Sequence, residues 1–192
     1  MDRLPTMPFM THPQTLQELN TCSAQAFAAA LADIWEHAPW VAARVVHQRP
    51  FSSVAALHQA MVEVVAALDD AARIAFYAGH PELAGADARR GSMTADSVAE
   101  QGTLSLASLS QTEAQRWDAL NQAYRARFGF PFILCIRRHT RDSALRAFEQ
   151  RLQNDRPAEL AAALDEIAAI TRLRLEARIL LTQPTPTPTT LS

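Results

Sequence analysis

The chain has 192 residues and a formal charge of −2, a length that fits one domain with a sizeable core. All 18 basic residues are arginine, which excludes chemistry that depends on lysine, such as Schiff-base formation. The charge gives no global basic footprint for nucleic acid, and no apolar run reaches the roughly 18 residues of a membrane span. Cys22 and Cys135 form no ligand motif, so neither a disulfide framework nor a metal site is expected. We therefore expect a cytoplasmic protein.

The sequence predicts a series of helices, most of them marked by apolar residues three and four apart and by a capping residue at the start. The expected segments are, in chain order, a loose arm over 1–13, one or two turns over 15–20, a helix over 24–36, a segment from Pro39 to about Arg49, helices over 54–68 and from Asp69-Asp70 to about His80, a short helix after Thr94, a helix from the Ser110–Glu113 capping box to about Phe128, one marked by Leu145, Phe148 and Leu152, and one from Pro157 to about Leu181.

Residues 130–136 form the only strand-like run, and a strand without a partner is better interpreted as a buried extended segment. The proline- and threonine-rich residues 183–192 have little apolar surface to bury and are expected to be disordered. The prediction is an all-α, single-domain bundle of roughly seven to nine helices over residues 14–182.

His80 is the leading candidate for a catalytic residue, because it stands at a predicted helix end in the loop Gly79-His80-Pro81-Glu82-Leu83-Ala84-Gly85. A helix C-terminus favours the protonated imidazole, and a histidine that titrates near neutrality suits general acid–base catalysis. The alternative is a histidine that only hydrogen-bonds the last carbonyls of its helix.

Ser97, Glu100 and Gln101 form a second candidate group, since their i, i+3, i+4 spacing places them on one helix face. A hydroxyl, a carboxylate and an amide together suit a substrate rich in amide groups. A solvated polar face is the commoner outcome for such a trio. A Ser–His–acid triad with His80 is a further reading, but no G-x-S-x-G elbow surrounds any serine.

Arg137 follows the apolar segment 130–136, and its planar guanidinium matches the geometry of a carboxylate. An exposed arginine that marks the end of the segment is an equally good interpretation. No pair of histidines at helical spacing suggests a metal site.

Five blocks of the sequence, in order, resemble a known enzyme family. They are Trp35-Glu36-His37-Ala38-Pro39-Trp40-Val41-Ala42, Arg49-Pro50-Phe51, His80-Pro81-Glu82-Leu83-Ala84-Gly85, Thr94-Ala95-Asp96-Ser97-Val98-Ala99-Glu100-Gln101 and Phe128-Gly129-Phe130-Pro131-Phe132-Ile133. The family is that of the 2-oxo-4-hydroxy-4-carboxy-5-ureidoimidazoline (OHCU) decarboxylases, which act last in the route from urate to (S)-allantoin. Ala38 and Gly79 depart from the family's more usual serine and alanine.

The resemblance implies an all-helical enzyme that needs no cofactor and no metal and is usually a homodimer. The family's catalytic histidine falls on His80, and Glu100 is the second residue expected in catalysis. The substrate-binding residues implied by the resemblance are Pro81, Ser97, Gln101, Phe132, Ile133 and Arg137, with Arg138 as the alternative to Arg137.

The expected function is therefore cofactor-independent decarboxylation of OHCU to (S)-allantoin. Two alternatives remain at this level. One is an enzyme with the same scaffold that acts on another small molecule rich in ureido or amide groups. The other is a non-catalytic helical binding protein, in which His80 only ends a helix.

Overall fold

The computed structural model describes residues 15–83 and 109–180, and within these ranges all regular structure is helical. The predicted all-α class is confirmed. The elements are α1 (Leu16–Thr21), α2 (Ala24–Ala30), α3 (Pro39–Val45), the 3-10 helix η1 (Val46–Gln48), α4 (Val54–Ala66), α5 (Asp70–Tyr77), α8 (Gln111–Phe128), the 3-10 helix η3 (Ile136–Arg138), α9 (Arg141–Arg151) and α10 (Arg156–Leu180). The predicted N-terminal arm, the helix after Thr94 and the C-terminal tail lie outside the described residues.

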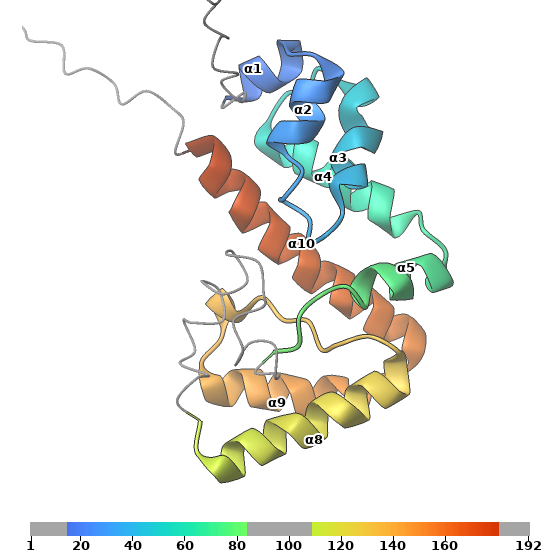
Figure 1. Cartoon of the computed structure of the whole chain (residues 1–192), viewed down its shortest axis with the longest axis vertical. Helices are drawn as coiled ribbons and strands as arrows, with labels where there is room; N and C mark the ends of the chain where they lie inside the picture. Colours follow the sequence, from blue (N-terminus) through green and yellow to red (C-terminus); the bar gives the residue numbers. More distant parts are fainter. Residues whose placement is uncertain (1–14, 84–108, 181–192) are drawn as a thin grey trace, which may run out of the picture.

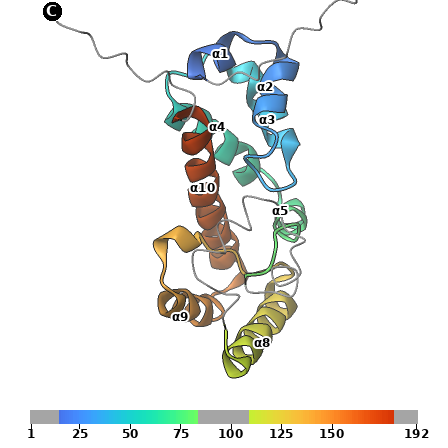
Figure 2. The same ribbon diagram turned by 60° about the vertical axis from the view of Figure 1, so that its left-hand side comes forward.

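The 25-residue helix α10 runs through the molecule and connects two groups of helices (Figure 1). Helices α1 to α4 gather around its C-terminal half, and α8 and α9 lie at the other end, as the rotated view also shows (Figure 2). Helices α4 and α5 both pack against α10. Buried apolar residues of both groups belong to one continuous core. None of the described helices combines the length and hydropathy of a membrane span.

Capping residues fix most helix boundaries where the sequence placed them. The hydroxyl of Ser53 accepts a hydrogen bond from the backbone N–H of Ala56 at the start of α4. Ser110 and Glu113 form the predicted capping box of α8. Gly129 ends α8 with a φ of 88°, a left-handed conformation that glycine adopts without a steric penalty. These local signals are confirmed because each one satisfies backbone groups that a helix end leaves unpaired.

The helix predicted over residues 24–36 is too long, since α2 ends at Ala30. The apolar residues that suggested its continuation, Leu31 and Ile34, are buried in an irregular turn instead. His37 then takes a φ of 51°, and the chain reverses before Pro39 begins α3. Tertiary packing of the turn therefore outweighs the helix propensity of the segment.

Residues 130–135 form a buried extended segment, one residue shorter than predicted, which leads into η3 at Ile136 and pairs with no strand in the described chain. Side chains supply hydrogen bonds that a neighbouring strand would provide. Arg151 donates to the carbonyl of Ile133 at 2.8 Å, and the N–H of Cys135 donates to Glu166 at 2.7 Å. The segment is thus fixed against α9 and α10.

A buried carboxylate joins α8, α9 and α10. Glu159 of α10 is fully buried and accepts hydrogen bonds from Arg151 at 2.5 Å, from Asn154 at 2.8 Å and from the hydroxyl of Tyr124. Arg151 also lies over the ring of Phe132. The same arginine therefore balances the buried charge and holds the extended segment.

Candidate active site

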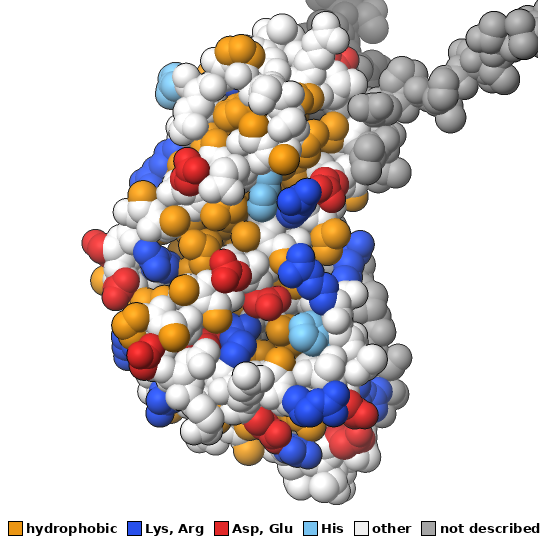
Figure 3. All heavy atoms as spheres, turned by 180° about the vertical axis from the view of Figure 1, so that it is seen from behind, with side chains coloured by type: hydrophobic (Ala, Val, Ile, Leu, Met, Phe, Trp, Pro, Cys, Tyr) orange, Lys and Arg blue, Asp and Glu red, His pale blue; other side chains and the backbone are white. Residues whose placement is uncertain are grey.

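One cavity lies where four parts of the chain meet near the middle of α10. Its walls come from the turn that carries Glu36, the loop after α5, the extended segment with η3, and one face of α10. The lining residues are Glu36, His80, Pro81, Leu83, Phe132, Ile133, Leu134, Cys135, Ile136, Arg137, Ile167, Ile170, Thr171, Leu173 and Arg174. Hydrophobic side chains reach the surface in the middle of the molecule, with arginine and acidic side chains around them (Figure 3).

The end of α5 positions His80 in this cavity. Asp69 caps the start of the helix, which ends at Tyr77. His80 lies three residues beyond that end, and its backbone N–H donates to the carbonyl of Tyr77. The ring packs edge-on against Phe76, with 5.1 Å between centroids. Nδ1 is buried and has no hydrogen-bond partner within the described residues. The side chain as a whole stays partly accessible from the cavity.

Burial lowers the pKa of His80 from its ordinary value of 6.5 to about 4. The carboxylate of Glu36 opposes this change, the guanidinium of Arg174 adds to it, and the nearby carbonyls of Phe76 and Tyr77 oppose it. The carbonyls at the helix end favour the protonated imidazole, as expected, but the prediction that His80 titrates near neutrality is wrong. Loss of hydration outweighs the helix-end carbonyls, so His80 is neutral at pH 7 and can accept a proton.

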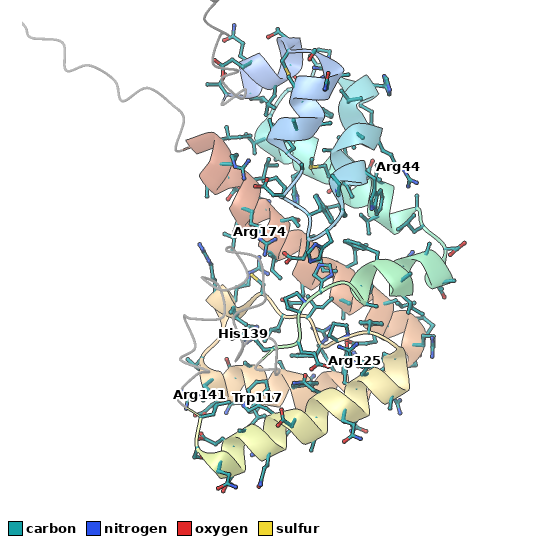
Figure 4. All side chains as sticks on the ribbon, viewed as in Figure 1. Arg44, Trp117, Arg125, His139, Arg141 and Arg174 are labelled. Carbon is teal, nitrogen blue, oxygen red and sulfur yellow. The ribbon has the colours of Figure 1, made fainter. Side chains whose placement is uncertain are left out.

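A buried ion pair stands beside His80. Arg174 Nη1 and Glu36 Oε2 lie 2.9 Å apart, and the two side chains are only 8% and 3% exposed. Arg174 extends from the C-terminal half of α10 in Figure 4, whereas Glu36 comes from the turn before α3. Two charges buried this deeply require each other, because removing either partner leaves an uncompensated charge.

The structure brings together several residues that the sequence predicted. Pro81, Phe132, Ile133 and Arg137 line the same cavity as His80. Arg137 is exposed, which places a cation at the edge of the cavity. Arg138 is exposed too but is not among the lining residues, so the geometry favours Arg137. Ser97, Glu100 and Gln101 lie outside the described residues.

Glu36 and Arg174 were missed as site residues by the sequence reasoning, although weak signals exist. Glu36 interrupts an apolar run between Ile34 and Trp40. Arg174 follows Ile167 and Ile170 by seven and four residues, so a charge lies on the apolar face of a helix. The ion pair between them could not be predicted from the sequence, because the two residues are 138 positions apart.

The loop after His80 is tied to α8 by two contacts. Glu82 forms an ion pair at 2.8 Å with Arg125, which Figure 4 labels on α8. Next to it, Asn121 of α8 donates to the carbonyl of Leu83 at 3.0 Å.

The cavity offers a neutral imidazole, two arginines and one carboxylate against apolar walls. This set can bind a small anion, exclude bulk water from part of it and move a proton. In the described part of the chain, no group of three or more His, Cys, Asp or Glu side chains could hold a metal ion.

Comparisons with known proteins point to one family. Residues 20–176 match the sequence model of the OHCU decarboxylases. A Haloferax volcanii protein named 2-oxo-4-hydroxy-4-carboxy-5-ureidoimidazoline decarboxylase is 38% identical over 87% of this chain and 97% of its own. The Mus musculus protein of the same name is 37% identical over 82% and 89%. A crystal structure of (S)-allantoin synthase superposes with a TM-score of 0.69 and 27% identity over 86% of this chain and 54% of its own.

Proposed function

This chain belongs to the OHCU decarboxylase family, and we propose that the cavity around His80 is its active site. The chain is a carboxy-lyase that converts 2-oxo-4-hydroxy-4-carboxy-5-ureidoimidazoline to allantoin, in the degradation of urate. The observation that carries the site assignment is the placement of His80. It is neutral at pH 7, partly accessible, and faces a cavity that also contains Arg137 and Arg174.

The reaction needs a place for an electron pair and a route for a proton. When the bond between the ring carbon and the carboxylate breaks, CO2 leaves, the electron pair forms a C=C bond to the neighbouring ring carbon, and the pair of the adjacent C=N bond moves onto its nitrogen. That nitrogen takes up a proton from water and becomes the ring N–H of the product. The substrate therefore supplies its own electron acceptor. The hydroxyl on the same carbon then gives up its proton as it becomes a carbonyl, and the neighbouring ring carbon gains one.

His80 serves both proton transfers in this proposal. As a neutral imidazole it accepts the hydroxyl proton, and as an imidazolium it returns a proton to the ring carbon. Burial favours the second step, because it makes the imidazolium of His80 a stronger acid than a solvent-exposed imidazolium. Delivery from one wall of the cavity puts the proton on one face of the ring, which sets the (S) configuration of the product.

The two arginines supply the charge that an anionic substrate requires. Arg137 at the edge and Arg174 inside the cavity hold substrate oxygens, and the apolar side chains of Phe132, Ile133 and Pro81 pack against the ring. The proposed roles of Glu100 in positioning the proton and of Ser97 and Gln101 in binding the ureido group rest on the resemblance. They stay predictions.

We also propose that the protein is a homodimer in the cytoplasm. The resemblance to the family supports the dimer. The composition of the sequence supports the cytoplasmic location. Light scattering coupled to size-exclusion chromatography tests the dimer directly, since a dimer has twice the chain mass of 21.1 kDa.

A coupled assay tests the function. Urate oxidase and hydroxyisourate hydrolase generate the unstable substrate in place, and circular dichroism follows the dextrorotatory product. We expect (S)-allantoin to form faster with the protein than without it. His80→Asn should lower the rate by about 10²- to 10⁴-fold with the fold retained. The control is His47→Asn, which changes an exposed histidine in η1.

The outcomes of this assay separate the alternatives. A spontaneous rate that the protein does not change would favour a different substrate or a binding protein. A folded His80→Asn variant with nearly full activity would refute the assignment of His80 while leaving the reaction in place. Neither alternative function finds support in the relatives reported above, which carry the names of OHCU decarboxylases and of an allantoin synthase.

A further inference from the structure

Glu36 is the carboxylate that the described chain places in the cavity, and the proposed reaction gives it no step. Glu36 is only 4% exposed, and acidic residues are almost never buried so deeply unless they are paired. Arg174 Nη1 lies 2.9 Å from Oε2 of Glu36, and Nε2 of the exposed His37 lies 3.9 Å from Oε1. The side chains of Glu36 and Arg174 also line the cavity beside His80.

The backbone around Glu36 is built to hold this position. Trp35 and Ala38 are buried on either side, and His37 takes the left-handed conformation that turns the chain toward α3. Non-glycine residues adopt such a conformation only where the surroundings impose it. The turn between α2 and α3 therefore places the carboxylate of Glu36 against Arg174 of α10.

The charges of this pair act on His80 in opposite directions. The carboxylate of Glu36 raises the pKa of the imidazole, and the guanidinium of Arg174 lowers it. Among residues 15–83 and 109–180, the charged groups that line the cavity with His80 are Glu36 from the turn before α3, Arg174 from α10 and Arg137 from η3. Without Glu36, a cationic cavity wall would oppose any positive charge on His80.

We propose that Glu36 is a positioning residue of the active site, which fixes the guanidinium of Arg174 in the cavity wall and balances its charge beside His80. The proposal rests on the proposed function for its catalytic consequence. The substrate brings a negative charge to Arg174, and the reaction needs a transient positive charge on His80. A carboxylate that stays paired with the arginine serves both requirements, because it orients the cation and stabilises the imidazolium.

The chain contains a matched control for this pair. Asp33 and Arg178 also join the turn region to α10, at 2.6 Å, three and four residues from Glu36 and Arg174 in sequence. Asp33 is 62% exposed, and neither residue lines the cavity. Asp33→Asn therefore removes an ion pair between the same two parts of the fold without changing the charge in the cavity.

The experiment compares Glu36→Gln, Arg174→Gln, the double variant and Asp33→Asn. Histidine labelled with ¹⁵N reports the midpoint of His80 titration by NMR, and the coupled assay gives kcat and KM. We expect the midpoint to fall in Glu36→Gln, to rise in Arg174→Gln and to return close to that of the unchanged protein in the double variant. We expect kcat of Glu36→Gln to fall about 10- to 100-fold, because its arginine is no longer fixed. Asp33→Asn should change neither quantity.

Opposite shifts of the midpoint are the signature that a merely structural role would not produce. Midpoints that do not move in Glu36→Gln and Arg174→Gln would overturn the proposal, and so would a Glu36→Gln variant with unchanged kcat. If Glu36→Gln does not fold, Arg174→Gln alone decides, since an unchanged or lowered midpoint there contradicts charge balance. The NMR readout does not depend on catalysis, so a failure of the proposed function would leave the midpoints shifted and only the kinetic result absent.

Discussion

Replacing His80 by asparagine should make the protein less sensitive to acid, although the change removes the proposed catalytic group. The folded protein keeps this imidazole neutral down to a pH of about 4, whereas the unfolded chain protonates it near 6.5. Between these two values the unfolded state binds one more proton than the folded state. The free energy of unfolding of the unchanged protein therefore decreases as the pH falls from 6.5 to 4.

The size of this effect follows from the same two pKa values. Each pH unit in the window corresponds to about 1.4 kcal/mol, so the full window corresponds to about 3 kcal/mol. This is an upper value, because the ring keeps part of its surface open to the cavity and to water. Above pH 6.5 the imidazole is neutral in both states, and the contribution disappears. Asparagine does not titrate, so His80→Asn lacks the decrease entirely.

Urea unfolding at a series of pH values from 7.5 to 4 measures this directly. The stability of His80→Asn relative to the unchanged protein should increase by up to about 3 kcal/mol across the series. His58, whose pKa burial also lowers, is present in both proteins and cancels in the difference. His47→Asn controls for the loss of an exposed histidine. Parallel stability curves for His80→Asn and the unchanged protein would refute the reasoning that burial keeps His80 neutral.

Three further predictions concern other parts of the fold. Glu159→Leu should destabilise the protein by about 3–5 kcal/mol in urea unfolding, because it leaves the buried guanidinium of Arg151 without its carboxylate; a loss below about 1 kcal/mol would contradict this. Gly129→Ala should cost about 1–2 kcal/mol, since the φ of 88° is unfavourable for a residue with a Cβ. Arg137→Ala should raise KM about tenfold in the coupled assay and Arg138→Ala should not, and equal effects would remove the distinction between them.

Most helix boundaries could be predicted because their determinants are local. Ser53 and the Ser110–Glu113 box act within one helical turn, and Gly129 ends α8 through its own backbone conformation. The end of α2 was predicted wrongly because its determinants are not local. Leu31 and Ile34 continue the apolar pattern of a helix, but they reach the core from a turn, which depends on the packing of distant helices.

Local signals in the sequence single out some residues of the proposed site, and their roles stay predictions. His80 stood out through its place at a helix end beside Pro81, and the resemblance supplied its role. Its protonation state was beyond local reasoning, because the buried surroundings that lower its pKa come from segments far along the chain. Glu36 and Arg174 likewise acquire their meaning only when the fold brings them to 2.9 Å.

Helix α10 contacts several of the described segments along one continuous helix. Glu159 serves the buried cluster, Glu166 holds the extended segment, Arg174 enters the cavity and Arg178 reaches α2. One inserted residue between Glu166 and Arg174 would rotate the rest of the helix by about 100° and advance it by about 1.5 Å. Sequence change in this helix is thus constrained in length as well as in chemistry. Diverging relatives can exchange its side chains one by one, but insertions and deletions should accumulate in the connections outside it.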